Sequence, residues 1–261
     1  MTSQSALLDM QNISVMRGSK TVLDGFTLKI NANEHVAILG PNGSGKSTLI
    51  KAITRECYPV ARADSSMRIL GQERWNVFDL RSHLGIVSND LLAACTGDAV
   101  GRDVVLSGFF SSNDVYPNHA VDQEKKHLAD EALRQLGVFH LAERPVCEMS
   151  SGEAKRILVA RALVHRPSAL LFDEPCNSLD LAAQHGLRQT MRSLANSGIG
   201  IILVTHELPD IIPEIERVIL MSKGKIVADG TKAEVLQPGS LSELFGMPVD
   251  IIRRDGFYHA G

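Results

Sequence analysis

The sequence has few cysteines, no long hydrophobic run and no excess of basic residues, and each absence excludes a class of protein. The 4 cysteines (Cys57, Cys95, Cys147 and Cys176) form no CxxC pair, so we expect neither a disulfide scaffold nor a zinc knuckle, but free thiols in the core. The longest apolar stretch, 199–204, is far short of the roughly 18 residues that a membrane-spanning helix needs. Lys and Arg total 27 against 30 Asp and Glu, so the composition does not favour nucleic-acid binding.

The composition that remains is that of an ordinary globular protein. The chain has 261 residues, of which 44% are apolar and 22% charged, and this length permits one domain or two. Its first residues lack a cationic region followed by an apolar run, so we expect no signal peptide. If the protein works at a membrane, we expect another chain to provide the membrane part.

Three short apolar runs are typical of strands buried in a parallel sheet: residues 35–40, 169–172 and 201–204. Helical stretches, such as 46–55, precede or separate them, and this alternation predicts an α/β fold. Residues 26–30 alternate between apolar and polar, as in a half-buried strand.

The middle of the chain, residues 90–149, has no comparable strand signal. Apolar residues recur there at helical spacing between Val121 and Leu136, and Gly137 is a suitable end for that helix. We therefore predict a helical insertion within the α/β core. Nearer the C-terminus, Thr231 with Glu234 and Ser240 with Glu243 each match a capping box and predict two short helices.

A glycine-rich segment after the first buried strand matches the phosphate-binding pattern GxxxxGK[ST]. Its residues are Gly40, Pro41, Asn42, Gly43, Ser44, Gly45, Lys46 and Ser47, with Thr48 next to them. Glycines let backbone N–H groups turn toward phosphate oxygens, and the following helix adds its positive N-terminus. Lys46 can reach the terminal phosphates, and the Ser47 hydroxyl can ligate Mg²⁺. The alternative is a strand–helix turn with an incidental lysine.

The second buried strand ends in two carboxylates, Asp173 and Glu174. In a parallel sheet the carboxyl ends of the strands face the nucleotide. Asp173 is the candidate for holding Mg²⁺ and Glu174 for polarising the attacking water. A solvated strand end is the alternative, and the upstream phosphate loop argues against it.

Together with these two motifs, three further segments resemble those of ABC-type ATPases. Residues 149–153, Met-Ser-Ser-Gly-Glu, resemble the signature motif, and Ala154–Leu163 resembles the helix that follows it. Residues 177–180 resemble the D-loop, and Thr205-His206-Glu207 resembles the H-loop. The likeness covers nearly the whole chain.

The resemblance implies a P-loop NTPase with a mainly parallel central sheet, an N-terminal antiparallel β subdomain and a helical subdomain at 90–149, inserted between 1–89 and 150–261 of one ABC ATPase domain. It implies ATP as substrate and Mg²⁺ as cofactor, in a head-to-tail dimer with itself or a paralogous subunit. Lys46, Glu174 and His206 would be catalytic. Ser150, Ser151, Gly152, Glu153 and Asp180 would contact the partner or its ATP, although Ser150 and Asp180 also suit ordinary helix N-caps.

Three positions depart from the family pattern. One is Glu153 at the end of the signature, where glutamine is common. The position of the aromatic residue that stacks on adenine holds Arg17, whose guanidinium plane is our candidate for the same role, the alternative being a solvated side chain. The Q-loop glutamine after the segment 84–87 is replaced by Asn89, which is one methylene shorter. We expect Asn89 to point toward the γ-phosphate and the metal, directly or through water.

The resemblance favours an ABC transporter ATPase subunit that drives separate transmembrane permease subunits from the cytoplasmic face, with import favoured over export. Glu153 in the signature and the segment 208–215 resemble the subgroup for molybdenum or iron-complex transport. A soluble ABC-type ATPase acting on ribosomes or nucleic acid is the alternative, and the lack of a basic arm argues against it. An apolar groove around Phe109 and Phe110 would suit a membrane subunit's helix, unless both rings belong to the core.

Overall fold

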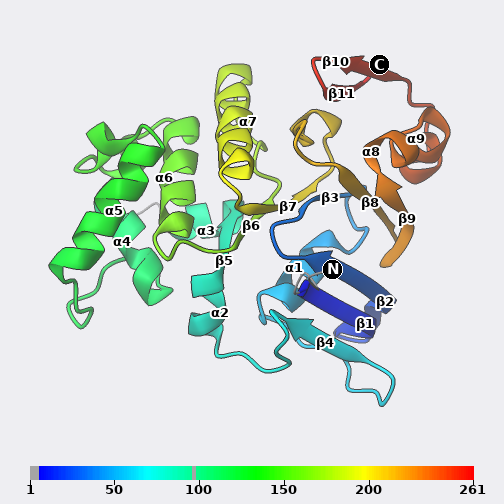
Figure 1. Cartoon of the computed structure of the whole chain (residues 1–261), viewed down its shortest axis with the longest axis horizontal. Helices are drawn as coiled ribbons and strands as arrows, with labels where there is room; N and C mark the ends of the chain where they lie inside the picture. The colour runs from blue at the N-terminus through cyan, green and yellow to red at the C-terminus, as the bar shows by residue number, and fades with distance from the viewer. Residues whose placement is uncertain (1–5, 96–97) are drawn as a thin grey trace. The chain divides into compact units, whose positions relative to one another are not determined.

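The computed structural model describes residues 6–95 and 98–261 of the chain. It shows an α/β fold whose central strands are mainly parallel, as predicted (Figure 1). The chain forms two compact units, one of the described residues up to Val77 together with Gly200–Gly261, the other of Phe78–Ile199. Within the described residues, no helix combines the length and the apolar character that crossing a membrane requires.

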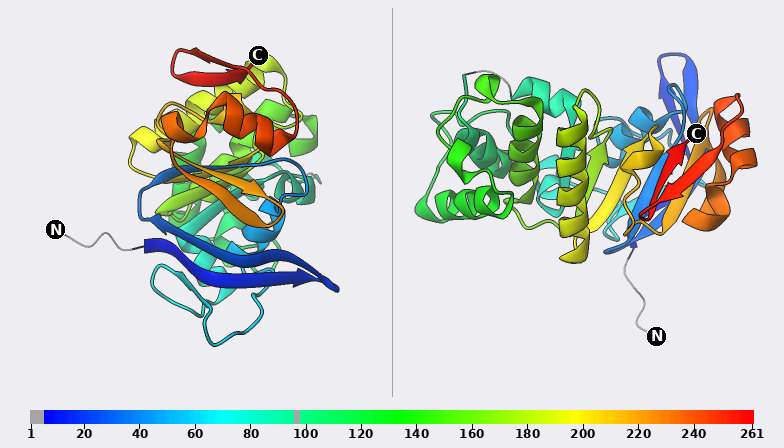
Figure 2. Two further views of the ribbon diagram at one scale, coloured as in Figure 1. Left: turned by 90° about the vertical axis from the view of Figure 1, so that its right-hand side faces the viewer. Right: turned by 90° about the horizontal axis from the view of Figure 1, so that it is seen from above.

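The first unit contains an antiparallel sheet and a set of parallel strands. Strands β1 (Ala6–Arg17), β2 (Lys20–Asn31) and β4 (Ser66–Ile69) form the antiparallel sheet, in which β1 and β2 make a long ribbon (Figure 2). The predicted alternation holds in β2, where Phe26, Leu28 and Ile30 are buried. Strand β3 (His35–Leu39) pairs in parallel with β7 (Gly200–Thr205) and β8 (Arg217–Ser222), and β9 (Lys225–Thr231) adds an antiparallel edge.

The remaining elements of the first unit are short. Helix α1 (Lys46–Ile53) follows the phosphate loop, and a 3-10 turn, η4 (Leu208–Asp210), follows β7. After β9 come α8 (Lys232–Val235), α9 (Pro238–Phe245) and the hairpin of β10 (Ile251–Arg254) and β11 (Phe257–Ala260).

The second unit combines two parallel strands with most of the helices. Strand β5 (Leu84–Ser88) follows α2 (Val77–His83) and pairs with β6 (Ala169–Asp173). Between the two strands lie α3 (Asn89–Ala94), α4 (Gly101–Ser107), η1 (Gly108–Phe110), α5 (Gln123–Gln135), η2 (Phe139–Leu141), η3 (Val146–Glu148) and α6 (Ser151–Leu163). Helix α7 (Leu181–Asn196) follows β6. The regular structure described within 90–149 is thus helical, while the boundaries at 90 and 149 remain a proposal.

The predicted helix ends are confirmed at two sites, after α5 and before α8, and differ from the structure at two others. Gly137 follows the end of α5 with φ of 67°, and Thr231 with Glu234 forms the capping box of α8. Helix α1 is about half a turn shorter than predicted. Ser240 does not cap a helix, because α9 begins two residues earlier at Pro238, whose fixed φ and missing N–H suit the first helical position.

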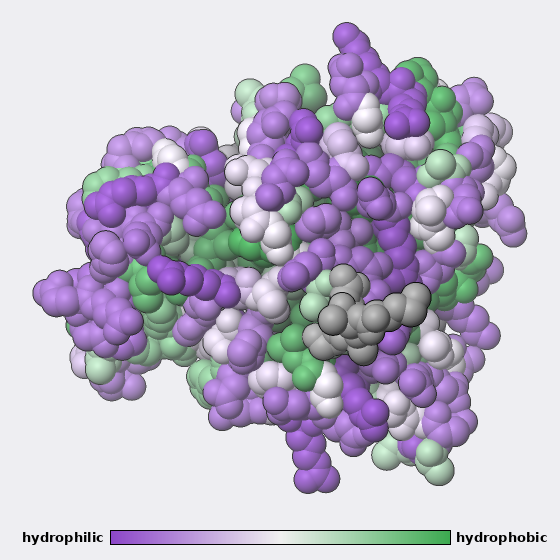
Figure 3. Space-filling model, in the orientation of Figure 1, coloured by the Kyte–Doolittle hydropathy of each residue, from purple (hydrophilic) through white to green (hydrophobic). Residues whose placement is uncertain are grey.

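Burial tests the prediction about the cysteines, and ring contacts test the one about Phe109 and Phe110. Cys95 and Cys176 lie in the core, but Cys57 is only half-buried and Cys147 is exposed, because in the turn η3 the side chain of Val146 faces the core instead. Phe109 meets the ring of His165 edge-on at 5.1 Å between centroids, and Phe110 stacks on His119 at 4.1 Å. Both phenylalanines therefore have partners within the second unit. On the face shown in Figure 3, the surface is mostly hydrophilic, with small separate apolar areas.

Candidate functional site

The phosphate loop lies between β3 and α1, and its backbone geometry requires glycine. Gly45, the N-cap of α1, has φ of 108°, a region that side chains other than glycine rarely adopt. A Cβ atom on Gly40 would lie 2.4 Å from the carbonyl oxygen of Met221, closer than any real contact. These glycines allow the loop to wind tightly before α1, with the N-terminus of that helix at its end.

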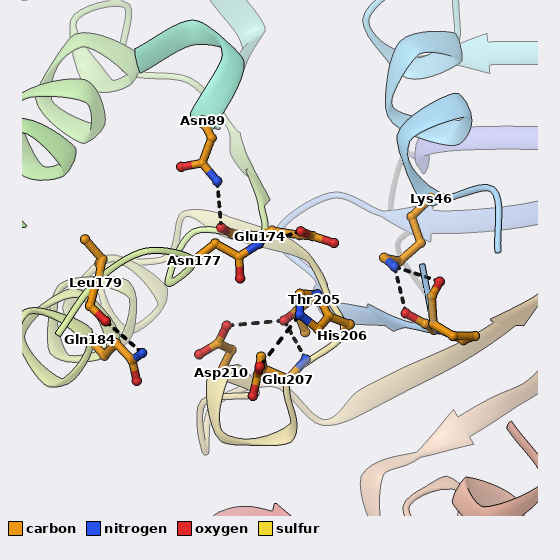
Figure 4. Close-up of polar contacts among 12 residues, drawn as sticks. Lys46, Asn89, Glu174, Asn177, Leu179, Gln184, Thr205, His206, Glu207 and Asp210 are labelled. Atoms are coloured by element: carbon orange, nitrogen blue, oxygen red, sulfur yellow. Dashed lines mark hydrogen bonds and ion pairs between the residues drawn. The ribbon is translucent and has the colours of Figure 1, made fainter. Parts of the chain in front are cut away.

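The polar groups of the loop are arranged to suit a phosphate. Lys46 is 5% exposed, and its Nζ donates to the carbonyl oxygens of Gly40 at 2.7 Å and Pro41 at 3.1 Å (Figure 4). The Ser44 Oγ is buried and has no hydrogen-bond partner among the described residues. A phosphate oxygen would satisfy Ser44, and burial without such a partner is costly. The neighbouring Ser47 is exposed and accessible to a ligand.

Strand register brings His206 to the phosphate loop within the first unit. Leu39 at the end of β3 pairs with Thr205 at the end of β7, and the Gly40 N–H donates to the Thr205 carbonyl at 3.4 Å. Gly40 and His206 are therefore the first residues after two adjacent parallel strands. His206 Nε2 lies 3.6 Å from Glu207 Oε1, an ion pair when the histidine is protonated.

Asp210, which the sequence analysis missed, supports the backbone that carries His206. The Thr205 Oγ1 donates to Asp210 Oδ2 at 3.2 Å and accepts from the Glu207 N–H at 3.0 Å (Figure 4). Asp210 is 1% exposed. The only signal in the sequence is an acidic residue within the otherwise apolar segment 208–212, and that signal names no partner.

In the second unit, register also places Asn89 beside Glu174. Ser88 at the end of β5 pairs with Asp173 at the end of β6, so that the residues following them are adjacent. The Asn89 Nδ2 donates to the backbone carbonyl of Glu174 at 3.4 Å (Figure 4). The candidate general base, the candidate metal-binding Asp173 and the residue in place of the Q-loop glutamine therefore lie together.

Glu174 is fixed at both its backbone and its side chain. It adopts φ of 44°, a left-handed conformation that costs a residue with a Cβ atom about 1 kcal/mol or more. Asn177 Nδ2 donates to Glu174 Oε2 at 2.6 Å, and the Asn177 N–H donates to the Glu174 carbonyl at 3.2 Å. The carboxylate is thus held in one direction. Sequence analysis placed Asn177 in the D-loop segment but did not find this contact.

Lys155 is a second residue that the sequence analysis left without a role. It lies one turn into α6, is 1% exposed, and its Nζ donates to the Asn89 Oδ1. Burial lowers the pKa of Lys155, and the nearby Cys176 and Asp173 oppose this shift. The oxygen of Asn89 is therefore engaged by a buried ammonium group in this structure.

The signature residues form the N-terminus of α6, as the alternative interpretation of Ser150 predicts. Ser150 is the N-cap, and its Oγ accepts from the Glu153 N–H at 3.3 Å. The Glu153 Oε2 accepts from the Ser150 N–H and Oγ, both at 2.8 Å, and these two bonds hold the pKa of Glu153 below its usual value. This reciprocal capping box fixes the helix end but leaves an acidic group there.

Helices α6 and α7 approach each other closely at the signature. A Cβ atom on Gly152 would lie 2.8 Å from the Ala183 Cβ, so only glycine fits. Asp180 is the N-cap of α7, and its Oδ1 accepts from the Ala183 N–H at 2.8 Å. The structure therefore brings the signature and the D-loop residue together in the second unit. Within the signature, Ser151 is exposed.

Arg17 ends strand β1, where it pairs with Lys20 across a tight turn. Its side chain is exposed, as both interpretations of this residue allow.

The predicted metal ligands divide between the units, Ser47 in the first and Asp173 with Asn89 in the second. Hydroxyl, carboxylate and amide oxygens are the ligands that Mg²⁺ accepts, usually beside substrate phosphates, so the donor chemistry fits this ion.

Comparison with known proteins places these motifs in one family. The family model for "ABC transporter" matches residues 23–177. The hemin import ATP-binding protein HmuV of Photobacterium profundum is 34% identical over 249 residues, which cover 92% of this chain and 85% of that protein. The HmuV protein of Bordetella avium is 32% identical over 259 residues, covering 94% of each chain.

Solved structures show the same fold. The structure of cbiO1 from Clostridium perfringens, part of the ABC transporter complex cbiONQ, matches with a TM-score of 0.76 at 25% identity, covering 92% of this chain and 94% of that one. The ADP conformation of an ATP-binding cassette of an ABC transporter matches with a TM-score of 0.77 at 23% identity, covering 92% and 98%. The second likeness is one of fold alone.

Proposed function

The chain belongs to the ABC transporter family as an ATP-hydrolysing subunit, and we propose that it powers the import of a metal chelate of the hemin type through separate membrane subunits. The relatives at 32% and 34% identity are named as hemin import proteins, and they match along nearly the whole of both chains. This kinship also argues against the alternative of a soluble ATPase acting on ribosomes or nucleic acid. We place the subunit at the cytoplasmic face of the membrane, where ATP is available.

The phosphate loop carries the proposal for ATP binding. Its N–H groups and Lys46 neutralise the phosphates, and the buried Ser44 hydroxyl gains the partner that the loop does not give it. His206, adjacent to Gly40 through the strand register, is proposed to contact the γ-phosphate. We propose that the backbone groups of residues 40–45, together with Ser47 and Thr48, also contribute to binding the phosphates of ATP.

Glu174 is proposed to be the general base that orients the attacking water. Its carboxylate is fixed by Asn177 at 2.6 Å, as positioning of a nucleophile requires. Ser47, Asp173 and Asn89 are the proposed holders of Mg²⁺, which supplies neutralisation of phosphate charge when bound. The Asn89 oxygen already accepts from Lys155, so its second lone pair is the one left for a metal.

We propose that two copies, or this chain and a paralogue, associate head to tail. The N-terminus of α6, with Ser150, Ser151 and Gly152, is a second helix end that can bind an anion. One ATP needs only the phosphate loop, so this second site is not needed by the same chain's own nucleotide. In a two-fold dimer it would serve the partner's nucleotide, and Asp180 would lie at the same interface. Glu153 is proposed to act by bracing Ser150.

Arg17 is proposed to stack its guanidinium plane on adenine. Its exposure at the tip of the β1–β2 ribbon leaves the side chain available, and guanidinium groups stack on aromatic planes. If so, Arg17 contributes to the affinity for ATP but not to that for inorganic triphosphate. Comparing the two ligands by thermal unfolding tests this.

The hydrolysis of ATP by the purified chain, beside Glu174→Gln, tests the proposed function. We expect the variant to bind ATP but to lose turnover by about 10²-fold or more, the usual contribution of a general base. Light scattering should show an ATP-dependent dimer that accumulates in Glu174→Gln, because the nucleotide is not consumed.

A wild-type chain that binds ATP but neither hydrolyses it nor dimerises, alone or with its membrane subunits, would contradict the composite-site mechanism. For the substrate, this chain can be reconstituted in vesicles together with its membrane subunits. ATP-dependent uptake of hemin supports the proposal, and stimulation by an unrelated solute in its place contradicts it.

A further inference from the structure

The buried Lys155 has an unusual position for a charged residue. It is 1% exposed and lies on α6, where Ala154 and Ile157 are also buried. Burying an ammonium group is costly unless the charge finds partners. A methionine of similar length would fill the same space at a lower cost, so packing alone does not explain a lysine here.

The polar groups near Lys155 lie where the paired strands β5 and β6 end. Its Nζ donates to Asn89 Oδ1, and the Asp173 carboxylate at the end of β6 favours its ammonium form. Helix α3, which begins at Asn89, packs against α6, so that Lys155 reaches from the interior to an exposed asparagine.

The side-chain amide of Asn89 contacts both Lys155 and Glu174. Its Oδ1 accepts from Lys155 while its Nδ2 donates to the Glu174 carbonyl at 3.4 Å. That carbonyl belongs to the residue with φ of 44°, a conformation that persists only when its surroundings hold it. The ammonium group also fixes which end of the Asn89 amide faces Glu174, because only the oxygen can accept from it.

From this chain of contacts we infer that Lys155 is a positioning residue for ATP hydrolysis, acting through Asn89 on the backbone of Glu174. The inference rests on the proposed role of Glu174 as general base. It differs from a metal role for Asn89, because here the amide oxygen serves the lysine and the amide nitrogen serves the glutamate.

The test is steady-state ATP hydrolysis by the full chain, with ATP affinity and the thermal unfolding midpoint measured on the same samples. Lys155→Met removes the charge and the donor but keeps a stem of similar length. We expect kcat to fall at least tenfold, KM for ATP to stay within twofold, and the midpoint to stay equal or rise, since a buried charge is removed. The matched control is Lys126→Met, which removes an exposed lysine on α5.

Asn89→Asp separates the two roles of that residue. Aspartate offers Lys155 and a metal better oxygen ligands, but it cannot donate to the Glu174 carbonyl. We expect a fall in kcat similar to that of Lys155→Met, and the double variant should be no slower than the slower single variant, because both changes break one chain of contacts. Asn89 is exposed, so this variant also serves if Lys155→Met does not fold.

Three results would overturn the inference. These are wild-type turnover in Lys155→Met, wild-type turnover in Asn89→Asp with a lower requirement for Mg²⁺, and a loss of turnover that follows a lowered unfolding midpoint. Glu174→Gln in the same assay keeps the two proposals apart. If the wild type turns over and Glu174→Gln does not, the general base stands whatever Lys155 does.

Discussion

At the scale of single residues, the proposed catalytic site at the end of β6 depends on small geometric tolerances. Glu174 is held by Asn177 and Asn89, and the signature Gly152 lies where α6 and α7 leave no room for a methyl group. The polar contacts determine direction, whereas the glycine determines how near two helices can approach.

Gly152→Ala tests that close approach. Its Cβ would meet the Ala183 Cβ at 2.8 Å, so we expect a loss of about 1–3 kcal/mol in the free energy of unfolding, the cost typical of overpacking. Gly186→Ala on α7 is the matched control, because a Cβ there has nothing within 4 Å. The control should gain about 0.5–1 kcal/mol from higher helix propensity. Urea unfolding measures both, and equal effects of the two variants would contradict the packing argument.

At the scale of elements, three of the proposed functional residues of the second unit lie at the beginnings of helices. Ser150 caps α6, Asp180 caps α7 and Asn89 begins α3. Each cap satisfies backbone N–H groups that the helix leaves unpaired, and the same geometry leaves a positive helix end near anions. A structural role as N-cap and a functional role at an interface are therefore compatible in Ser150 and Asp180.

Asp180 and Asp122 are N-caps that accept the same kind of backbone bond, and comparing them separates these two roles. Asp122 also accepts from the Lys125 ammonium group. Each accepts a backbone N–H at 2.8 Å, from Ala183 and Lys125 respectively. We expect Asp180→Ala and Asp122→Ala each to lower the free energy of unfolding by about 1 kcal/mol. Only Asp180→Ala should also weaken ATP-dependent dimerisation, measured by light scattering in the Glu174→Gln background.

Asp180→Asn serves as the control for stability, since asparagine caps a helix about as well as aspartate. Dimerisation that is equally weakened by Asp122→Ala would show that the effect comes from stability rather than from the proposed interface.

At the scale of the whole molecule, ligand binding and stability are linked. ATP that binds the folded chain but not the unfolded one stabilises it by about 2.7 kcal/mol at a concentration 100 times its Kd. The thermal unfolding midpoint therefore reports binding without any turnover. Glu174→Gln is the suitable background, because it should retain the nucleotide.

In that background, Arg17→Ala should reduce the rise in midpoint that ATP produces but leave the rise produced by inorganic triphosphate unchanged. The reason is that the proposed stacking involves only the base. Lys46→Ala, which removes the ammonium of the phosphate loop, should reduce both. An equal effect of Arg17→Ala on the two ligands would favour the solvated alternative for this side chain.

Features that depend on neighbouring residues were determined by the sequence itself. The phosphate loop, the buried strands β3, β6 and β7, the helix stop at Gly137 and the capping box at Thr231 each follow from residues a few positions apart. Where two local signals competed, sequence reasoning failed, since Pro238 and not Ser240 sets the start of α9. The order of motifs was sufficient to identify the family, because each motif needs its residues at fixed spacing.

Only the tertiary structure decided which distant side chains meet. Asn89 and Glu174 are 85 residues apart and Asn89 and Lys155 are 66 apart, yet strand register and the packing of α3 on α6 join them. The same holds for Gly152 with Ala183. A pattern in the sequence shows which residue types are present, but the partner of a buried charge is fixed by the packing of elements far apart in the chain. For that reason the motifs of the site were predictable, while the contacts that hold Glu174 in place were not.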